Sequence, residues 1–242
     1  MDFTVLFLCV LSLIWGGWAL RKYIRPYFRR KTLKSWLENH VNSNQFKITI
    51  SQLHSIYRFS FSHQVANFAK TTRGLKKTNY LYGEIDILNF IYILDKLNPN
   101  TEDVFYDLGS GAGKAVLTAA IAFPLKKAVG IEIVPELITL SRTRLTKYHA
   151  QPFDKISQCK IQFIQGDFLK IPLNDATIVF VNATAFSEYF WQYVLKKLIE
   201  LPQNTHIIIN THTLPNPYFN LISQGYEIMS WGLTLVSLYQ RR

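Results

Sequence analysis

Cysteine is scarce in this chain of 242 residues, where it occurs only at positions 9 and 159. Two cysteines so far apart form neither a disulfide framework nor the paired ligand spacing of a zinc site. The six histidines likewise lack the HxxxH and HExxH spacings of metal-binding helices. We therefore expect no metal site, and we interpret Cys159 as an inert thiol.

Acidic residues are almost absent from the N-terminal third. Up to Asn79 the chain has 13 lysines and arginines against two acids, whereas from Tyr80 onward each sign occurs 14 times. The net charge of +11 therefore belongs to the N-terminal third and not to the whole chain. This distribution does not indicate a uniformly cationic nucleic-acid-binding domain, so we expect no nucleic-acid partner.

Charge of either sign is absent from the 18 residues Phe3 to Leu20, FTVLFLCVLSLIWGGWAL. At about 1.5 Å per residue, a helix of this length just spans the hydrocarbon core of a membrane. The run is preceded by Met1-Asp2 and lacks the basic start and small-residue cleavage site of a signal peptide. We therefore predict a transmembrane anchor over residues 1–20.

Seven basic residues follow before the next acid: Arg21, Lys22, Arg25, Arg29, Arg30, Lys31 and Lys34. The simpler interpretation is a positive-inside signal that keeps the rest of the chain on the cytosolic or an equivalent matrix side. A second, compatible interpretation is a polybasic patch at 21–34 that contacts anionic lipid or nucleic acid. We predict a single-pass membrane protein with a basic juxtamembrane and helical segment at 21–79 and a catalytic domain at 80–242.

Strand-like and helix-like patterns alternate in residues 80–242. We predict strands at 104–108, 128–133, 160–165, 176–182 and 206–210, and helices at 85–97, 114–122, 135–148 and 187–201. Two further β-rich runs, 226–231 and 232–239, predict a closing antiparallel hairpin. This order is typical of an α/β fold with a mostly parallel sheet, helices on both faces, and ligands at the carboxyl edge.

The segment DLGSGAGK, residues 107–114, has three glycines on alternate positions after an acid that ends a strand. A Walker A loop requires GxxxxGK before Ser or Thr, but Ala115 follows Lys114 and the upstream glycine is missing. A dinucleotide turn requires GxGxxG, and Lys114 occupies the place of its third glycine. The pattern that remains is that of S-adenosylmethionine (SAM) sites, where glycines allow close approach of the backbone to the ligand. The glycines are Gly109, Gly111 and Gly113.

An acid follows each of three successive strands. Asp107 can bond the ammonium group of SAM, directly or through water, and Glu132 can accept from both ribose hydroxyls. Asp167, in the segment GDF, can accept from the adenine amino group, with Phe168 packed near the ring. Because the carboxyl ends of parallel strands share one edge, this ordered set predicts SAM as the cofactor.

The segments YLYGE, DLGSGAGK, GIEI, GDF and IVFVNATAF occur in this order. With them the chain resembles, over roughly residues 80–239, the disruptor-of-telomeric-silencing family of histone lysine methyltransferases that lack a SET domain. It is also similar to small mitochondrial and bacterial lysine methyltransferases with a hydrophobic N-terminus. The glycine motif and the acids are common to class I methyltransferases, whereas YGE at 82–84 and VFVNATAF at 179–186 are more specific. The resemblance implies a Rossmann-like class I methyltransferase sheet, here preceded by the predicted transmembrane helix.

The resemblance also implies which residues act on the methyl group. Tyr82 would lie on a loop over the methionine end of SAM, and Asn182 would stand beside the transferring methyl. Phe186 and Trp231 would line the channel for the acceptor side chain. Taken alone, Asn182 also has a simpler interpretation as a cap of the following helix.

Several positions depart from the family's motifs. Ala183 follows Asn182 where the family has a second asparagine, and Thr184 replaces an aromatic residue. Ile85 replaces a hydroxyl residue after YGE, and Leu238 replaces one of two tyrosines. The differences concern the acceptor channel more than the SAM site.

A lysine acceptor agrees with the chemistry of methyl transfer. Transfer from a sulfonium is an in-line displacement, for which an enzyme mainly supplies proximity and orientation. A lysine amine must first lose its proton, and an apolar aromatic channel lowers its pKa by desolvation. We therefore predict a membrane-anchored, SAM-dependent methyltransferase that acts on a lysine of a protein substrate. Two alternatives remain open: a membrane-bound methyltransferase of a lipid or quinone, and a non-catalytic, membrane-tethered interaction module with the same fold.

Overall fold

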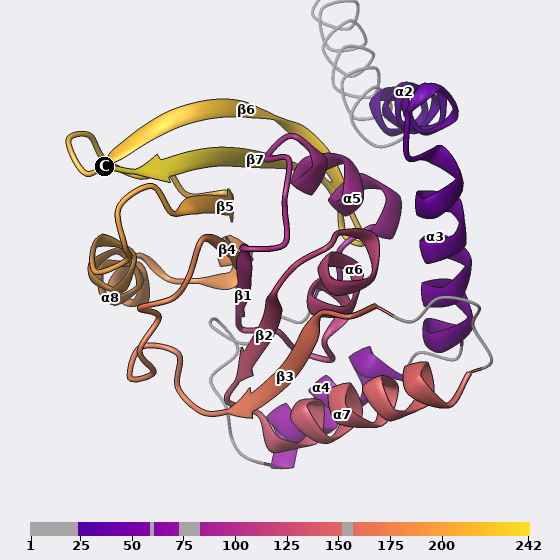
Figure 1. The fold of residues 1–242 in the computed structure, drawn as a ribbon. Helices are drawn as coiled ribbons and strands as arrows, with labels where there is room; N and C mark the ends of the chain where they lie inside the picture. Colours follow the sequence, from indigo (N-terminus) through magenta and orange to yellow (C-terminus); the bar gives the residue numbers. More distant parts are fainter. Residues whose placement is uncertain (1–23, 59–60, 73–82, 152–156) are drawn as a thin grey trace, which may run out of the picture.

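Seven strands form one sheet in the computed structural model, which describes residues 24–58, 61–72, 83–151 and 157–242 (Figure 1). In chain order they are β1 (Val104–Leu108), β2 (Lys127–Glu132), β3 (Lys160–Gln165), β4 (Ile178–Val181), β5 (His206–Asn210), β6 (Phe219–Met229) and β7 (Gly232–Arg241). Their order in the sheet is β3-β2-β1-β4-β5-β7-β6. The predicted α/β sheet is therefore confirmed, and β1, β3 and β5 have the predicted bounds.

The first five strands run parallel, so their carboxyl ends meet at one edge of the sheet. The last two form the predicted antiparallel hairpin, which joins the sheet through β5 and β7. β6 begins at Phe219 and not, as predicted, at Tyr226. Its first half is largely exposed at the edge of the sheet, and apolar and polar residues do not alternate regularly there, so no strand pattern is recognised.

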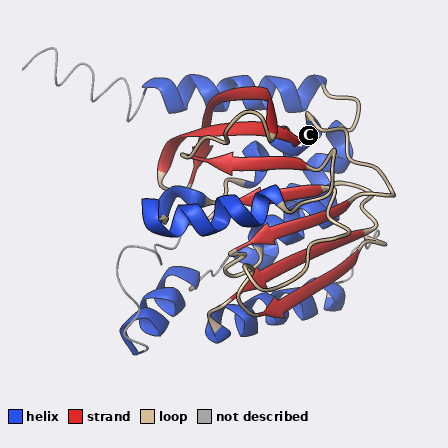
Figure 2. Cartoon of the chain, turned by 90° about the vertical axis from the view of Figure 1, so that its left-hand side faces the viewer, coloured by secondary structure: helices blue, strands red, loops and turns tan. Residues whose placement is uncertain are grey.

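Helices cover both faces of the sheet, as predicted (Figures 1 and 2). On one face are α5 (Ile87–Asp95), α6 (Lys114–Ala122) and α7 (Pro135–Ala150), and on the other is α8 (Glu188–Ile199). Neighbouring residues of a strand point to opposite faces, so Phe105 packs in the core under α5 and α6, whereas Tyr106 packs in the core under α8. An apolar core on each face therefore fixes the sheet, and with it the position of its carboxyl edge.

Among the described residues, three further helices precede the sheet: α2 (Arg25–Asn39), α3 (Ser43–Tyr57) and α4 (Ser62–Thr72). They lie within residues 21–79, where the sequence predicts a helical segment. α3 packs against α6, and α4 packs against α7. Phe46 of α3 is buried, with its ring centroid 5.6 Å from that of Phe123, so α3 shares the core of the sheet.

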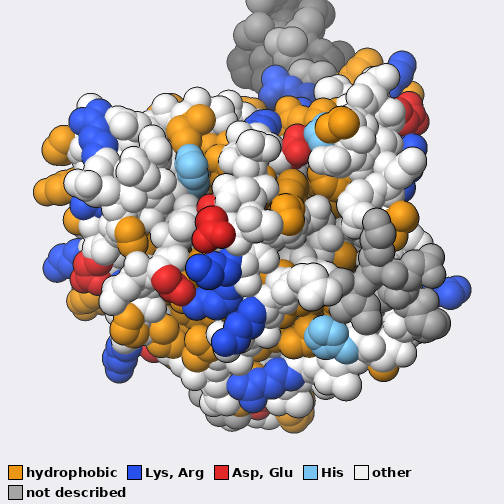
Figure 3. Space-filling model, viewed as in Figure 1, with side chains coloured by type: hydrophobic (Ala, Val, Ile, Leu, Met, Phe, Trp, Pro, Cys, Tyr) orange, Lys and Arg blue, Asp and Glu red, His pale blue; other side chains and the backbone are white. Residues whose placement is uncertain are grey.

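Charges of both signs lie together at the amino ends of the strands. Asp175 bonds both Nζ of Lys127, at 2.6 Å, and the hydroxyl of Tyr106, at 2.7 Å. Figure 3 shows basic and acidic side chains side by side in the middle of the face seen in Figure 1. This mixture agrees with the balanced charge of the chain from Tyr80 onward.

The prediction of a transmembrane helix is corrected by the structure. In the part of the chain that the structure describes, no helix is long and apolar enough to cross a membrane. The run at 3–20 that motivated the prediction lies outside the described residues, as does most of the loop predicted at 71–79. The membrane placement and the lipid partner that were predicted with this helix are therefore not retained.

Candidate active site

A cavity of about 290 Å³ opens at the carboxyl edge of the sheet, which is the edge that the sequence predicts for a ligand. Its wall combines the glycine turn, the ends of β1, β2 and β4, and the segment 83–85. The predicted residues that line it are Asp107, Gly109, Gly111, Glu132, Asp167, Phe168, Asn182 and Phe186. A volume of this order is close to the size of known small-molecule sites.

The glycine turn joins β1 to α6 in a backbone conformation that side chains disfavour. Gly109, Gly111 and Gly113 have φ angles of 86°, 52° and 81°, all in the left-handed region. A Cβ at Gly113 would also lie 2.6 Å from the ring of Phe163. Around Gly109, in contrast, nothing lies within 4 Å of the position that a Cβ would occupy. The turn is thus packed at its helix end and open where it lines the cavity.

Two residues outside the motif hold the turn from behind. Arg144 of α7 donates from Nη1 to the carbonyl of Ala112 at 3.0 Å, and the hydroxyl of Tyr57 donates to the same carbonyl at 3.3 Å. The guanidinium of Arg144 also lies 4.3 Å from the ring centroid of Tyr57. Neither residue is among those predicted, because no sequence motif marks a side chain that bonds the backbone of a distant element.

Two carboxylates are buried beside the turn. Glu132 accepts from the N–H of Gly111 and from the N–H of Val134, both at 2.9 Å. Burial raises the pKa of Glu132, although these N–H groups act in the opposite direction. Burial, followed by the charge of Glu132, also raises the pKa of Asp107 well above its usual range. A cation in the cavity would favour the ionised form of both groups.

Aromatic rings form the side of the cavity nearest α8. The ring centroid of Phe168 lies 6.4 Å from that of Phe186 and 6.2 Å from that of Phe190, and the last two rings meet edge to face at 4.9 Å. Asp167 accepts from the N–H of Leu169 at 3.0 Å, which fixes the turn after β3. Phe190 is an addition to the predicted residues, because only the packing of α8 brings it to the cavity.

Asn182 belongs to a polar cluster at the carboxyl ends of β4 and β5. Its Oδ1 accepts from Oγ1 of Thr184 at 3.0 Å and from Nδ2 of Asn210 at 3.2 Å. Its side chain makes no capping bond to the following 3₁₀ helix η2 (Ala183–Ala185). Since these two donors occupy Oδ1, the amide group Nδ2 is the one that Asn182 can offer to a ligand.

An ion pair in the cavity wall links the segment 83–85 to α6. Nζ of Lys114 lies 3.1 Å from Oε2 of Glu84, and both residues line the cavity. Tyr82, which was predicted to cover the methionine end of SAM, lies outside the described residues. Trp231 does not line this cavity; its ring packs against Gly83, where an added Cβ would lie 2.4 Å from it.

A family model matches residues 57–230, which is more than half of the chain. The family is described as the histone methylation protein DOT1. The chain belongs to this family. The matched region contains the glycine turn, the three acids and Asn182, so the resemblance predicted from the motifs is confirmed.

Two curated relatives of this DOT1-family chain are named as lysine methyltransferases. A histone-lysine N-methyltransferase of Caenorhabditis elegans, H3 lysine-79 specific, is 30% identical over 190 residues, which cover 75% of this chain and 19% of that protein. A protein-lysine N-methyltransferase of Saccharolobus islandicus is 31% identical over 87 residues, which cover 36% of this chain and 50% of that protein. The chain therefore spans about a fifth of the length of the worm protein.

Solved structures share the fold of this DOT1-family chain. TrmN from Thermus thermophilus has a TM-score of 0.51 at 14% identity, over 64% of this chain and 49% of that one. The putative methyltransferase yhhF from Escherichia coli has a TM-score of 0.51 at 18% identity, over 64% of this chain and 86% of that one. At such identities the similarity concerns the fold alone.

Proposed function

We propose that this DOT1-family chain is a SAM-dependent methyltransferase that transfers a methyl group to a lysine side chain of a protein. The observation that carries the proposal is the pair of buried carboxylates, Asp107 and Glu132, in the wall of a cavity beside the glycine turn. Family membership and the named activities of the two relatives support the same reaction and the same cofactor.

The residues around the cavity fit SAM. Its ammonium and sulfonium groups are cations, and they would stabilise the ionised form of Asp107. The carboxylate of Glu132 has lone pairs left after its two backbone bonds, so it can also accept from the ribose hydroxyls. Asp167 and Phe168 would hold the adenine.

When bound, SAM supplies an electrophilic methyl group, and the residues of the chain have to place the acceptor amine in line with it and exclude water. Phe186 and Phe190 offer an apolar wall near Asn182. Desolvation against this wall lowers the pKa of a lysine amine, so that its neutral, nucleophilic form is populated. Nδ2 of Asn182 would then orient either the methionine end of SAM or the amine.

The acceptor protein is proposed from the relatives. Both named relatives modify lysine in proteins, and one of them is specific for a histone. A histone is therefore the first substrate to test, with other host proteins beside it. Tyr82 remains a proposal for the methionine end of SAM and lies outside the described residues. Trp231 remains a proposal for the acceptor channel, although it does not line the cavity.

Transfer of a labelled methyl group tests the proposed function. The purified chain is incubated with labelled SAM and either histones or a host lysate, and the label is measured in the protein, lipid and nucleic-acid fractions. We expect label in protein, and its loss with Asp107→Asn in a variant that unfolds cooperatively. Label in lipid alone would favour the lipid or quinone methyltransferase. A wild-type chain that does not bind SAM in a calorimetric titration would favour the non-catalytic module.

A further inference from the structure

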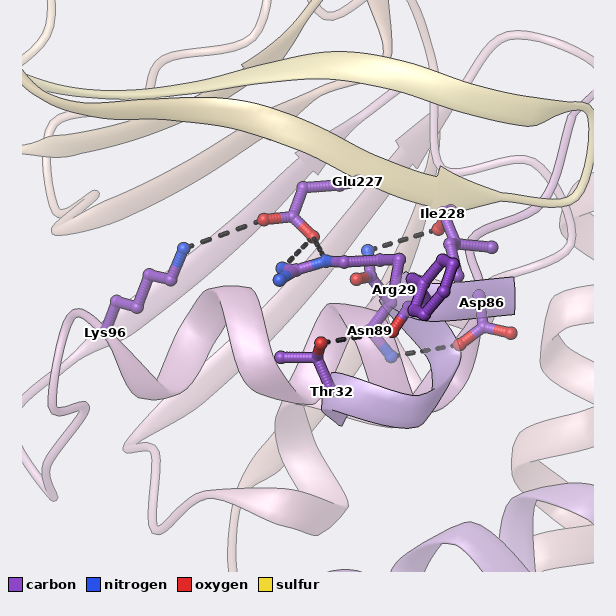
Figure 4. Close-up of polar contacts among 8 residues, drawn as sticks. Arg29, Thr32, Asp86, Asn89, Lys96, Glu227 and Ile228 are labelled. Atoms are coloured by element: carbon purple, nitrogen blue, oxygen red, sulfur yellow. Dashed lines mark hydrogen bonds and ion pairs between the residues drawn. The ribbon is translucent and has the colours of Figure 1, made fainter. Parts of the chain in front are cut away.

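A buried acid ties the N-terminal helix α2 to the C-terminal hairpin (Figure 4). Glu227 of β6 is 3% exposed; its carboxylate bonds the guanidinium of Arg29 from α2 and lies 3.6 Å from Nζ of Lys96, which follows α5. The guanidinium of Arg29 also lies 4.6 Å from the ring centroid of Tyr92 in α5. A buried carboxylate that loses such a partner is left uncompensated, so this contact restrains α2 against the hairpin.

Asn89 of α5 restrains the next residue of the same strand. Its Nδ2 donates to the carbonyl of Ile228 at 3.1 Å, and its N–H donates to Oδ1 of Asp86, which caps the helix, at 3.0 Å. Figure 4 shows these contacts beside Glu227, between α5 and the hairpin. The start of the hairpin tip is therefore held by α2 and α5 together.

The other end of the hairpin tip contacts the cavity wall. Met229 pairs with Ile85 in an isolated antiparallel bridge. Ser230 bonds Glu84 twice, because its N–H donates to the Glu84 carbonyl and its Oγ accepts from the Glu84 N–H, each at 3.0 Å. Glu84 and Ile85 line the cavity, and Glu84 also pairs with Lys114. Residues 227–230 thus connect α2 and α5 directly to the wall of the proposed SAM site.

We propose that Glu227 and Ser230 are positioning residues for SAM binding, which hold the segment 83–85 in place at the cavity. This inference rests on the proposed function and deepens it. It assigns a part in the site to α2, a helix that lies before the region matched by the family model. Arg29, one of the seven basic residues that follow the apolar run, then serves the site from within the fold and not a lipid surface.

Calorimetric titration of the full chain with SAM, together with thermal unfolding of each variant, tests this proposal. Ser230→Ala removes one bond to Glu84 from an exposed position, and we expect it to fold normally and to bind SAM at least about three-fold more weakly. For Glu227→Gln we expect a loss of about ten-fold, equal to about 1.4 kcal/mol. Combining it with Arg29→Gln should add little, because the two groups act as a pair.

Asp175→Asn is the matched control. It removes the ion pair with Lys127 at the opposite edge of the sheet, so it should lower stability and leave SAM affinity unchanged. Wild-type affinity in both Ser230→Ala and Glu227→Gln would overturn the proposal. So would an equal loss of affinity in the control, or additive losses in the Arg29 and Glu227 pair. A wild-type chain that fails to bind SAM would overturn the proposed function, and this inference with it.

Discussion

Replacing Glu132 by glutamine tests whether this side chain holds the glycine turn as well as the cofactor. Each of its carboxylate oxygens accepts from a backbone N–H, of Gly111 or Val134, at 2.9 Å. Glutamine keeps the length of the side chain but has a single acceptor oxygen, so one N–H would face an NH₂ donor. A hydrogen bond to a charged group contributes about 1.5–3 kcal/mol. Burial raises the pKa of Glu132, so removal of the charge offsets part of this loss. We expect the free energy of unfolding to fall by about 1–2 kcal/mol.

In a domain of this size, 1 kcal/mol shifts the Tm by about 2–4 °C, so the variant should melt about 2–8 °C lower in a calorimetric scan. Glu102→Gln is the control. The side chain of Glu102 is 82% exposed and its ion pair with Lys126 is long, at 3.7 Å, so its loss should change the Tm very little. SAM titration of the same samples should show affinity lowered by about ten-fold or more. A wild-type Tm would refute the role of Glu132 in the turn, and unchanged SAM affinity would remove it from the cofactor site.

Four other predictions concern the cavity and the glycine turn beside it. Asn182→Ala should fold and bind SAM normally yet transfer the methyl group about ten-fold more slowly, or about 1.4 kcal/mol in the barrier, and wild-type turnover would exclude it from catalysis. The pKa of Asp107 is raised in the folded chain, so its contribution to stability is complete below the unfolded pKa of 3.8 and is lost as the pH rises through the folded pKa. Asp107→Asn should therefore raise the Tm of the SAM-free chain at neutral pH. An unchanged Tm would contradict this. A bound cation favours the ionised form, so SAM affinity measured by calorimetry should fall as the pH is lowered through the raised pKa, and a flat profile would speak against contact with Asp107. Gly113→Ala should lower the Tm more than Gly109→Ala, because both need a left-handed backbone but only the first meets the ring of Phe163; equal losses would contradict this packing.

The central part of the fold and of the site could be predicted because its signals are local. Each acid lies at or just after the carboxyl end of a strand, and parallel strands bring these ends to one edge without any long-range information. For the same reason the three glycines mark the turn between β1 and α6. All of these residues except Gly113 line the cavity, together with Asn182 and Phe186.

The supports of the site could not be predicted in this way. Arg144 and Tyr57 bond a backbone carbonyl of another element, and such a carbonyl is present at every residue. Asn210 reaches Asn182 across two neighbouring strands, and only its place at the end of the HIIIN run points to the site edge. Phe190 depends on how α8 packs.

The role of the basic run after residue 20 could not be predicted from the sequence either. Charge density alone does not distinguish a solvated or lipid-facing arginine from one that pairs inside the fold. Arg29 belongs to the second kind, because its acid, Glu227, lies 198 residues away in the chain. Only the docking of α2 on the hairpin brings the two together.

Identification of the methylated atom tests the central claim most directly. The full chain is incubated with isotope-labelled SAM and with histones or host proteins, beside Asn182→Ala at the same SAM occupancy, and the digested proteins are analysed by mass spectrometry. The account predicts labelled methyl groups on lysine side-chain nitrogen, reduced about ten-fold in the variant. Label on another side chain, on nucleic acid or on lipid, with the lysines unmodified, would contradict it.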